Sequence, residues 1–284
     1  MGIEYLSGVK PGDKIDLSRF ERKTTQEKEI NPDHYLPSLK EGLLNLSKEA
    51  NKYLDGFLDD EGKISISGKD EKADLALIAS QEDAFSRDFY GKKPEDMEAF
   101  QREKEKSIPN LTEIALTLLL DKFLKDRFIV ARASSYDDYN NGVDNVLIDK
   151  KSGEVLCGFD EVVSRVGTSF SAKKEVKMER AMAKGGAKLK YGARLENGKL
   201  VRASASNIPA FYIPLDKKEL KDLLEALKNE QDKDSSKEVM KKIFSKMLIS
   251  LSDQISRYNL DDDLKNKTKA VFKKIEEVAN FSKN

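Results

Sequence analysis

The sequence predicts a mixed α/β fold in which a small central sheet is flanked by helices, with helical additions at both ends of the chain. Apolar residues recur at helical spacing in the first and last thirds of the 284 residues. The middle third carries short runs rich in β-branched and aromatic residues, such as 128–132 and 211–215. Glycine-containing turns, Lys151-Ser152-Gly153 and Glu196-Asn197-Gly198, separate further runs of this kind. We therefore expect few strands and many helices.

Residues 1–106 are predicted to form an N-terminal helical region that is loosely ordered over its polar start, 1–30. Asn31-Pro32-Asp33 is typical of a helix N-terminus, and leucines at helical spacing follow it to about Phe57. Further helices are predicted over 71–106 with an interruption near 91–94, and over 111–125, 171–184, 216–228 and 239–281.

Residues 107–228 are predicted to form the α/β core, and 229–284 a polar linker followed by a helical tail. The pair Asn197-Gly198 favours a tight hairpin turn. An apolar stripe along the tail indicates a buried helix face. Strands are predicted over 128–132, 141–149, 154–161, 188–195, 199–205 and 211–215.

The hairpin formed by 141–149 and 154–161 determines which acidic side chains meet. If Lys151-Ser152-Gly153 is a three-residue loop with its glycine in the left-handed conformation, Asp144 faces Asp160 on one side of the sheet. A four-residue loop would instead place Asp144 opposite Phe159. The position of the glycine favours the three-residue loop.

Acidic residues at the same end of two neighbouring strands are suited to a divalent cation, because Mg²⁺ and Mn²⁺ prefer carboxylate oxygens and water. Asp144 opens the first strand, and Asp160 and Glu161 close the second. Side chains alternate along a strand, so at most one of Asp160 and Glu161 faces the site. Asp149 is expected to serve the turn. The sequence therefore predicts a metal site formed by Asp144 and Asp160.

The net charge is zero, with 51 basic and 51 acidic residues, but the charges are unevenly placed. Residues 136–161 contain seven acids against two lysines, whereas residues 172–202 contain ten basic residues against three acids. An acidic pocket beside a basic segment suits metal-assisted cleavage of nucleic acid, with 172–202 contacting the phosphate backbone. The alternative is that both segments are solvated surfaces in a highly charged chain.

Several classes of protein are disfavoured. The single cysteine, Cys157, rules out an intramolecular disulfide and a cysteine-rich zinc site. The start lacks the basic and apolar pattern of a signal peptide, and the apolar run 114–120 is too short to span a membrane. We therefore expect a cytoplasmic protein without membrane contact. The only histidine, His34, lies in a predicted first helical turn, where a surface or capping role is expected.

The order helix, three strands, helix, strand over about 107–215 resembles the core of the PD-(D/E)XK nuclease-like superfamily, a restriction-endonuclease-like fold. Gly142-Val143-Asp144 is similar to the family's first acidic element, and Asp160-Glu161-Val162 lies where its acid-x-lysine triplet is expected. The resemblance implies a Mg²⁺- or Mn²⁺-dependent nuclease whose metal ligands are Asp144, Asp160 and the backbone carbonyl of Glu161. It also implies a contribution from Glu113 on the preceding helix.

The sequence departs from the family at Val162, where the family carries its lysine. Some members supply that lysine from the neighbouring helix, and the resemblance makes Lys173 and Lys177 the candidates. These two lysines are four residues apart and so share one helix face. The missing lysine favours the non-catalytic alternative described next.

Structural alternatives exist for the same residues. Glu113 stands three residues after Asn110, a spacing typical of a helix capping box. Asp144 can terminate a strand by bonding to backbone amides. On this reading the chain is a non-catalytic interaction or scaffold protein that contacts a protein partner through its C-terminal helix.

Overall fold

The computed structural model describes residues 30–90, 97–163, 169–229 and 233–281. The chain divides into two units, Met1–Asn31 and Pro32–Asn284, and the elements given below belong to the second. The predicted loose order of 1–30 falls almost wholly outside the described residues. Within them the structure confirms a mixed α/β fold.

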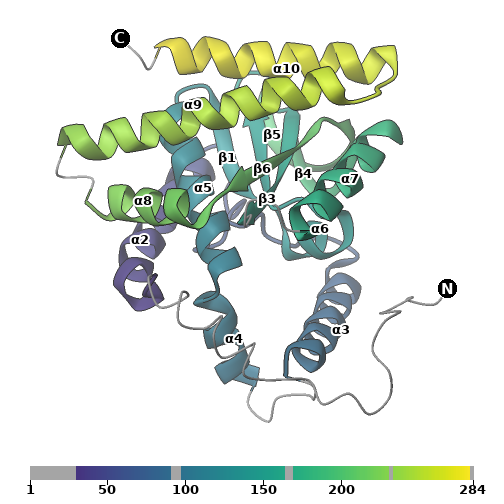
Figure 1. Ribbon diagram of the computed structural model, residues 1–284. Helices are drawn as coiled ribbons and strands as arrows, with labels where there is room; N and C mark the ends of the chain where they lie inside the picture. Colours follow the sequence, from purple (N-terminus) through teal and green to yellow (C-terminus); the bar gives the residue numbers. More distant parts are fainter. Residues whose placement is uncertain (1–29, 91–96, 164–168, 230–232, 282–284) are drawn as a thin grey trace, which may run out of the picture. The chain divides into compact units, whose positions relative to one another are not determined.

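The central sheet has four strands in the order β1-β2-β3-β6 (Figure 1). They are β1 (Phe128–Arg132), β2 (Asn145–Asp149), β3 (Val155–Val163) and β6 (Ala210–Leu215). The first three pair antiparallel, whereas β3 and β6 run parallel. Every residue of β1 and β2 is buried, as expected for strands covered on both faces.

A separate two-stranded sheet lies between β3 and β6 in the sequence, formed by β4 (Ala187–Glu196) and β5 (Lys199–Ile208). The turn residues Asn197 and Gly198 both have positive φ, 51° and 76°. Two successive left-handed residues match the right-handed twist of a hairpin, which confirms the turn that the Asn-Gly pair predicts. Both strands also contact β3.

Helix α5 (Ile108–Leu124) packs against β1 and β3, and it is covered in turn by α2 (Pro32–Asn51) and α8 (Lys217–Lys228). The N-cap of α5 is Ser107, whose hydroxyl accepts a hydrogen bond from the Asn110 amide. The helix thus begins earlier than predicted, so the capping box expected of Asn110 and Glu113 is wrong. The Glu113 side chain therefore does not cap this helix.

Four helices lie around the ends of the sheets: α3 (Glu71–Tyr90), α4 (Met97–Glu105), α6 (Ser135–Asn141) and α7 (Ser169–Ala183). The short α6 was not predicted, because its polar sequence reads as a loop. Ser134 caps its start, and Gly142, with φ of 66°, ends it. Helix α6 contacts α3 and β4, and α7 contacts β6.

The C-terminal tail forms two helices, α9 (Lys233–Arg257) and α10 (Asp262–Phe281), that lie side by side (Figure 1). The apolar stripe of α9 is buried within the chain, since α9 packs on α8 and β6 and α10 packs on α9 and α5. Buried members of the stripe are Met240, Ile243, Phe244, Met247 and Leu251. No described helix is long and apolar enough to cross a membrane.

Candidate functional site: a buried carboxyl cluster

The β2–β3 hairpin has a four-residue turn, so the predicted three-residue loop is wrong. The Asp149 amide donates to the Glu154 carbonyl at 2.9 Å, and the Gly153 amide donates back to the Asp149 carbonyl at 2.7 Å. Gly153 does have a left-handed φ of 69°, as expected. The Asp149 carboxylate accepts the Lys151 amide at 2.8 Å, which confirms its role in the turn.

A β-bulge past Leu147 then changes the register by one residue, so Asn145 faces Phe159. The Asp144 amide also donates to the Phe159 carbonyl, at 2.8 Å. Asp144 therefore lies at the end of the ladder, and its carboxylate turns along β3. There its Oδ2 accepts the backbone amide of Glu161 at 2.8 Å.

Glu161, rather than Asp160, belongs to the hydrogen-bond network around Asp144. The Asn145 side chain donates to Glu161 Oε1 at 2.9 Å, and Thr117 Oγ1 of α5 donates to Asn145 Oδ1 at 2.7 Å. Since β3 pairs with β6 without interruption through Val163, Asp160 and Glu161 point to opposite faces. The face that carries Glu161 is the face covered by α5.

Burial raises the pKa of both acids. The pKa of Asp144 lies well above its ordinary value, first through desolvation and then through the charges of Glu161, Glu113 and Asp160. Desolvation raises the pKa of Glu161 to about 8, although hydrogen bonding with Asn145 and Asp144 opposes the rise. Glu161 Oε2 is buried and has no hydrogen-bond donor among the described residues. A proton or a cation between the two carboxyl groups would fill that position.

Glu113 joins the cluster from α5. Arg132, at the end of β1, donates to Glu113 Oε2 at 2.8 Å and to Asn110 Oδ1 at 2.9 Å. The Glu113 charge also contributes to the raised pKa values of Asp144 and Glu161. The structure thus brings together three of the predicted site residues, from one helix and two strands.

Lys63, to which no sequence pattern assigned a role, lies near Glu113 and Asp138. Residues 62–64 pair with Arg132: the Arg132 amide donates to the Gly62 carbonyl at 2.8 Å, and Ile64 donates to the Arg132 carbonyl at 3.0 Å. Desolvation and then the Arg132 charge lower the pKa of Lys63, while the charges of Asp138 and Glu113 oppose the lowering. The alternating isoleucines after Lys63 indicate an extended chain. They do not indicate that this chain pairs with β1.

Asp138 of α6 completes the charged surroundings. Burial and the Glu113 charge raise the pKa of its carboxyl to about 6. Its neighbour Asp137 has a different, structural role. The Asp137 carboxylate accepts the backbone amides of Lys190 at 2.7 Å and Tyr191 at 3.0 Å, and so fixes β4 to α6.

The remaining predicted residues are Asp160, Lys177 and Lys173. Asp160 is buried, and its charge acts on Asp144 less strongly than that of Glu161. Lys177 is exposed on α7, with its Nζ 3.1 Å from the position that a Cβ on Gly142 would take. The side chain of Lys173 lies outside the described residues. Among the residues that are described, no three His, Cys, Asp or Glu side chains are placed to hold a metal ion.

The basic segment 172–202 is partly neutralised by the chain itself. Lys190 Nζ lies 2.6 Å from Asp74 and 3.3 Å from Asp70. Arg194 pairs with Glu196. Lys184 and Lys188 are exposed.

The raised pKa values predict that the protein loses stability as the pH rises. The folded state retains protons on Asp144 and Glu161 that the unfolded state has lost above about pH 4. This stabilisation is complete below that pH and is lost as the pH rises through about 8 for Glu161. Without divalent ions, the thermal midpoint should fall by roughly 5 °C between pH 6 and 9. Glu161→Gln should flatten that profile, and an unchanged profile would contradict the prediction.

The carboxyl cluster has the chemistry of a site for a proton or a hard cation. Its donors are carboxylate oxygens, which suit Mg²⁺ and Mn²⁺, and the buried Glu161 Oε2 needs a positive partner. Acids with raised pKa values beside a lysine with a lowered one are characteristic of functional sites. Comparison of the chain with protein-family models, with curated proteins and with solved structures gives no match.

Proposed function

We propose that this protein is a divalent-metal-dependent nuclease-like protein that acts on nucleic acid phosphodiesters. The observation that carries the proposal is the meeting of Glu113 in the first half of α5, Asp144 just before β2 and Glu161 near the end of β3. The order α5, β1, β2, β3, α7, β6, interrupted by α6 and by the β4–β5 hairpin, supports it, because it follows the order that the resemblance to the PD-(D/E)XK superfamily implies.

Asp144 and Glu161 would hold Mg²⁺ or Mn²⁺ together with water, and Glu113, paired with Arg132, would add negative charge from α5. Such an ion supplies a bound water of lowered pKa and neutralises charge on the phosphate. The high pKa values of the acids fit this role, because a cation would replace the protons that they otherwise retain. Asp160 would add negative charge from the other face of β3.

Lys63 would supply the positive charge that the family obtains from the lysine at the position of Val162. Its ammonium group approaches the acids from the loop that pairs with β1, and burial makes its proton easier to give up. Lys177 would act at the edge of the site, where its Nζ lies beside Gly142. The exposed Lys184 and Lys188 would contact the phosphate backbone at a distance from the acids.

The proposal is tested by incubating the protein with labelled single- and double-stranded DNA and RNA, with and without Mn²⁺ or Mg²⁺. Cleavage that requires the ion and stops when a chelator is added is the expected result. Calorimetric titration with Mn²⁺ should show saturable binding that is stronger at pH 8 than at pH 6, because the acids must lose their protons. Neither ion binding nor cleavage, even with nucleic acid present, would overturn the proposal.

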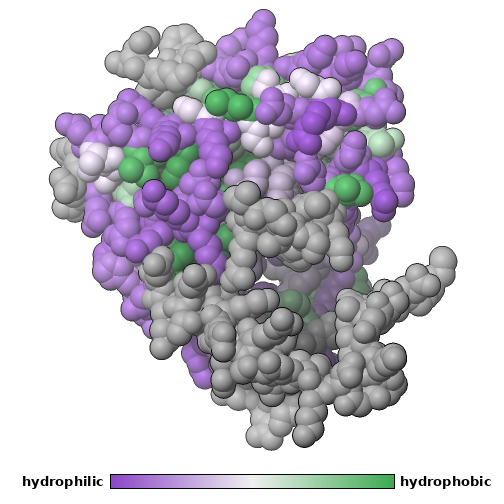
Figure 2. Space-filling view, viewed as in Figure 1, coloured by the Kyte–Doolittle hydropathy of each residue, from purple (hydrophilic) through white to green (hydrophobic). Residues whose placement is uncertain are grey.

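A second function, a non-catalytic scaffold, is favoured by the bonds inside the cluster. Arg132 already pairs with Glu113, and Asn145 with Glu161, as in a buried structural network. A partner contact through the tail would have to use the outer face of α9, where Ile249 is 63% exposed. Figure 2 shows mostly hydrophilic residues with isolated apolar ones on the face in view. Absence of ion binding in the preceding experiment selects this second function.

A further inference from the structure

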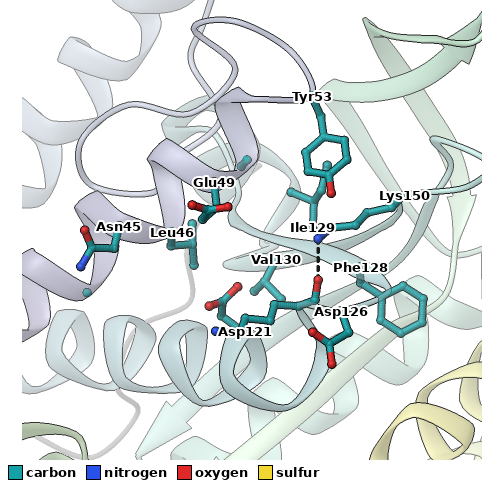
Figure 3. Close-up of a pocket in the computed structure, with 13 residues that line it drawn as sticks. Asn45, Leu46, Glu49, Tyr53, Asp121, Asp126, Phe128, Ile129, Val130 and Lys150 are labelled. Atoms are coloured by element: carbon teal, nitrogen blue, oxygen red, sulfur yellow. Dashed lines mark hydrogen bonds between the residues drawn. The ribbon is translucent and has the colours of Figure 1, made fainter.

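Helix α5 borders two polar regions, and the unmet hydrogen-bonding capacity lies at the carboxyl cluster. The other region is a cavity of 390 Å³ between α2, α5 and the start of β1 (Figure 3). There Glu49 pairs with Lys52, and Lys150 donates to the Lys125 carbonyl, the bond dashed in Figure 3. Among the described residues, no buried side-chain oxygen or nitrogen that lines this cavity lacks a partner, whereas Glu161 Oε2 at the cluster does.

Asn145 determines which oxygen of Glu161 is left open. Its amide nitrogen donates to Glu161 Oε1 at 2.9 Å, and Oε2 remains without a donor. Asn145 is fully buried at the start of β2, and the three residues that follow it, Val146, Leu147 and Ile148, are apolar. A buried amide costs free energy unless its hydrogen bonds are made, so an apolar residue would serve packing better at this position. The presence of asparagine therefore indicates a role in holding Glu161.

Thr117 of α5 fixes the other end of the Asn145 amide. Thr117 Oγ1 lies 2.7 Å from Asn145 Oδ1 and 2.6 Å from the Glu113 carbonyl, so its single proton is shared between these two acceptors. On the β1–β2 ladder Asn145 is paired with Arg132, which donates to the Glu113 carboxylate. One rung of the sheet thus holds two acids of the cluster.

We propose that Asn145 is a positioning residue of the divalent-ion site: it holds Oε1 of Glu161, presents Oε2 alone to the ion, and so favours Mg²⁺ and Mn²⁺ over Ca²⁺. The inference rests on the proposed function and assigns the ion preference of that site. Mg²⁺ takes single oxygens from one or two carboxylates and completes an octahedron with water, and Mn²⁺ also takes octahedral oxygen sites. Ca²⁺ takes about six to eight oxygens and often both oxygens of one carboxylate.

The test is calorimetric titration of the full chain with Mn²⁺ and with Ca²⁺ at one pH. The wild type should bind Mn²⁺ more tightly than Ca²⁺. Thr117→Val is nearly isosteric and removes the hydroxyl that holds Asn145, and Asn145→Leu removes the donor itself. Each should weaken Mn²⁺ binding roughly tenfold and Ca²⁺ binding by less, because Glu161 can then turn both oxygens to the ion. Thr117→Ser keeps the hydroxyl and should restore both affinities.

Thr112→Val is the matched control. Thr112 is also buried on α5, and its hydroxyl donates to the carbonyl four residues earlier, that of Ile108, at 2.7 Å. It has the same helical bond as Thr117 without the link to Asn145. Thr112→Val should therefore lower the thermal midpoint of the ion-free protein about as much as Thr117→Val, and should leave both affinities and the ion preference unchanged.

Two results would overturn the inference and leave the proposed function intact. One is Mn²⁺ binding by Thr117→Val and Asn145→Leu with the affinity and preference of the wild type, and the other is equal weakening by Thr112→Val. If Asn145→Leu does not fold, Thr117→Val decides. If the wild type binds neither ion, with or without nucleic acid, the proposed function fails and the inference fails with it.

Discussion

Asp144→Asn is expected to lower ion-dependent cleavage of nucleic acid at least about 100-fold and to abolish saturable Mn²⁺ binding. Asp144 contacts Glu161 in two ways: its Oδ2 accepts the Glu161 amide at 2.8 Å, and its carboxyl lies beside that of Glu161. Asparagine keeps the size and one acceptor oxygen but removes the charge that a cation requires. The measurement is the initial rate of oligonucleotide cleavage over a range of Mn²⁺ concentrations.

Two further substitutions separate the two faces of β3. Glu161→Gln should lose as much activity as Asp144→Asn, whereas Asp160→Asn should lose less, because Asp160 points to the opposite face. Asp222→Asn, on the exposed side of α8, is the control and should behave as the wild type. If Asp160→Asn is the most damaging of the set, the site lies on the other face and the assignment of Glu161 is wrong.

Both acid substitutions should also make the apo protein more stable at high pH. Asp144 and Glu161 resist ionisation in the folded state, so a neutral amide removes a cost that grows as the pH rises. Loss of activity together with retained or increased stability distinguishes a functional role from a purely structural one. Stability sacrificed at a site is a frequent mark of function.

Local patterns were sufficient to predict most of the elements. The Asn197-Gly198 turn needs two left-handed residues, and Asp216 begins α8 with both bonds of a capping box, so short-range chemistry determines these boundaries. Helix α6 is the counterexample. Its sequence, with Asp137 and Asp138, is typical of a loop, and the helix depends on the capping by Ser134 and on contacts with β4 and α3.

The candidate site was predicted in part because its register depends on non-local contacts. The four-residue turn shifts the pairing of β2 with β3 by one residue, and the bulge past Leu147 shifts it back by one. No local signal in the sequence reveals this bulge. Glu113 faces the cluster because Arg132 of β1 holds it there. Lys63 reaches the acids through pairing between chain segments almost seventy residues apart, which no periodic pattern encodes.

Asp137→Ala is expected to destabilise the protein by about 3–5 kcal/mol, which lowers the thermal midpoint by roughly 10 °C. The Asp137 carboxylate is fully buried and accepts four hydrogen bonds. Two come from the side chains of Ser134 and Asn141 and two from the backbone amides of Lys190 and Tyr191. Alanine would leave the buried Ser134 hydroxyl and Tyr191 amide without this acceptor, and would release β4 from α6.

The neighbouring acid provides the control for that measurement. Asp138→Ala removes a carboxyl from the same helix, but burial raises the pKa of Asp138 to about 6, so its charge is unfavourable in the folded state. Its removal should change the free energy of unfolding by less than about 1 kcal/mol. Hydrogen exchange should show faster exchange of the Lys190 and Tyr191 amides in Asp137→Ala alone, since only that substitution removes their acceptor. Equal destabilisation by the two substitutions would mean that the negative charge of α6, and not the hydrogen bonds of Asp137, stabilises the fold. Asp137 would then not anchor the β4–β5 hairpin.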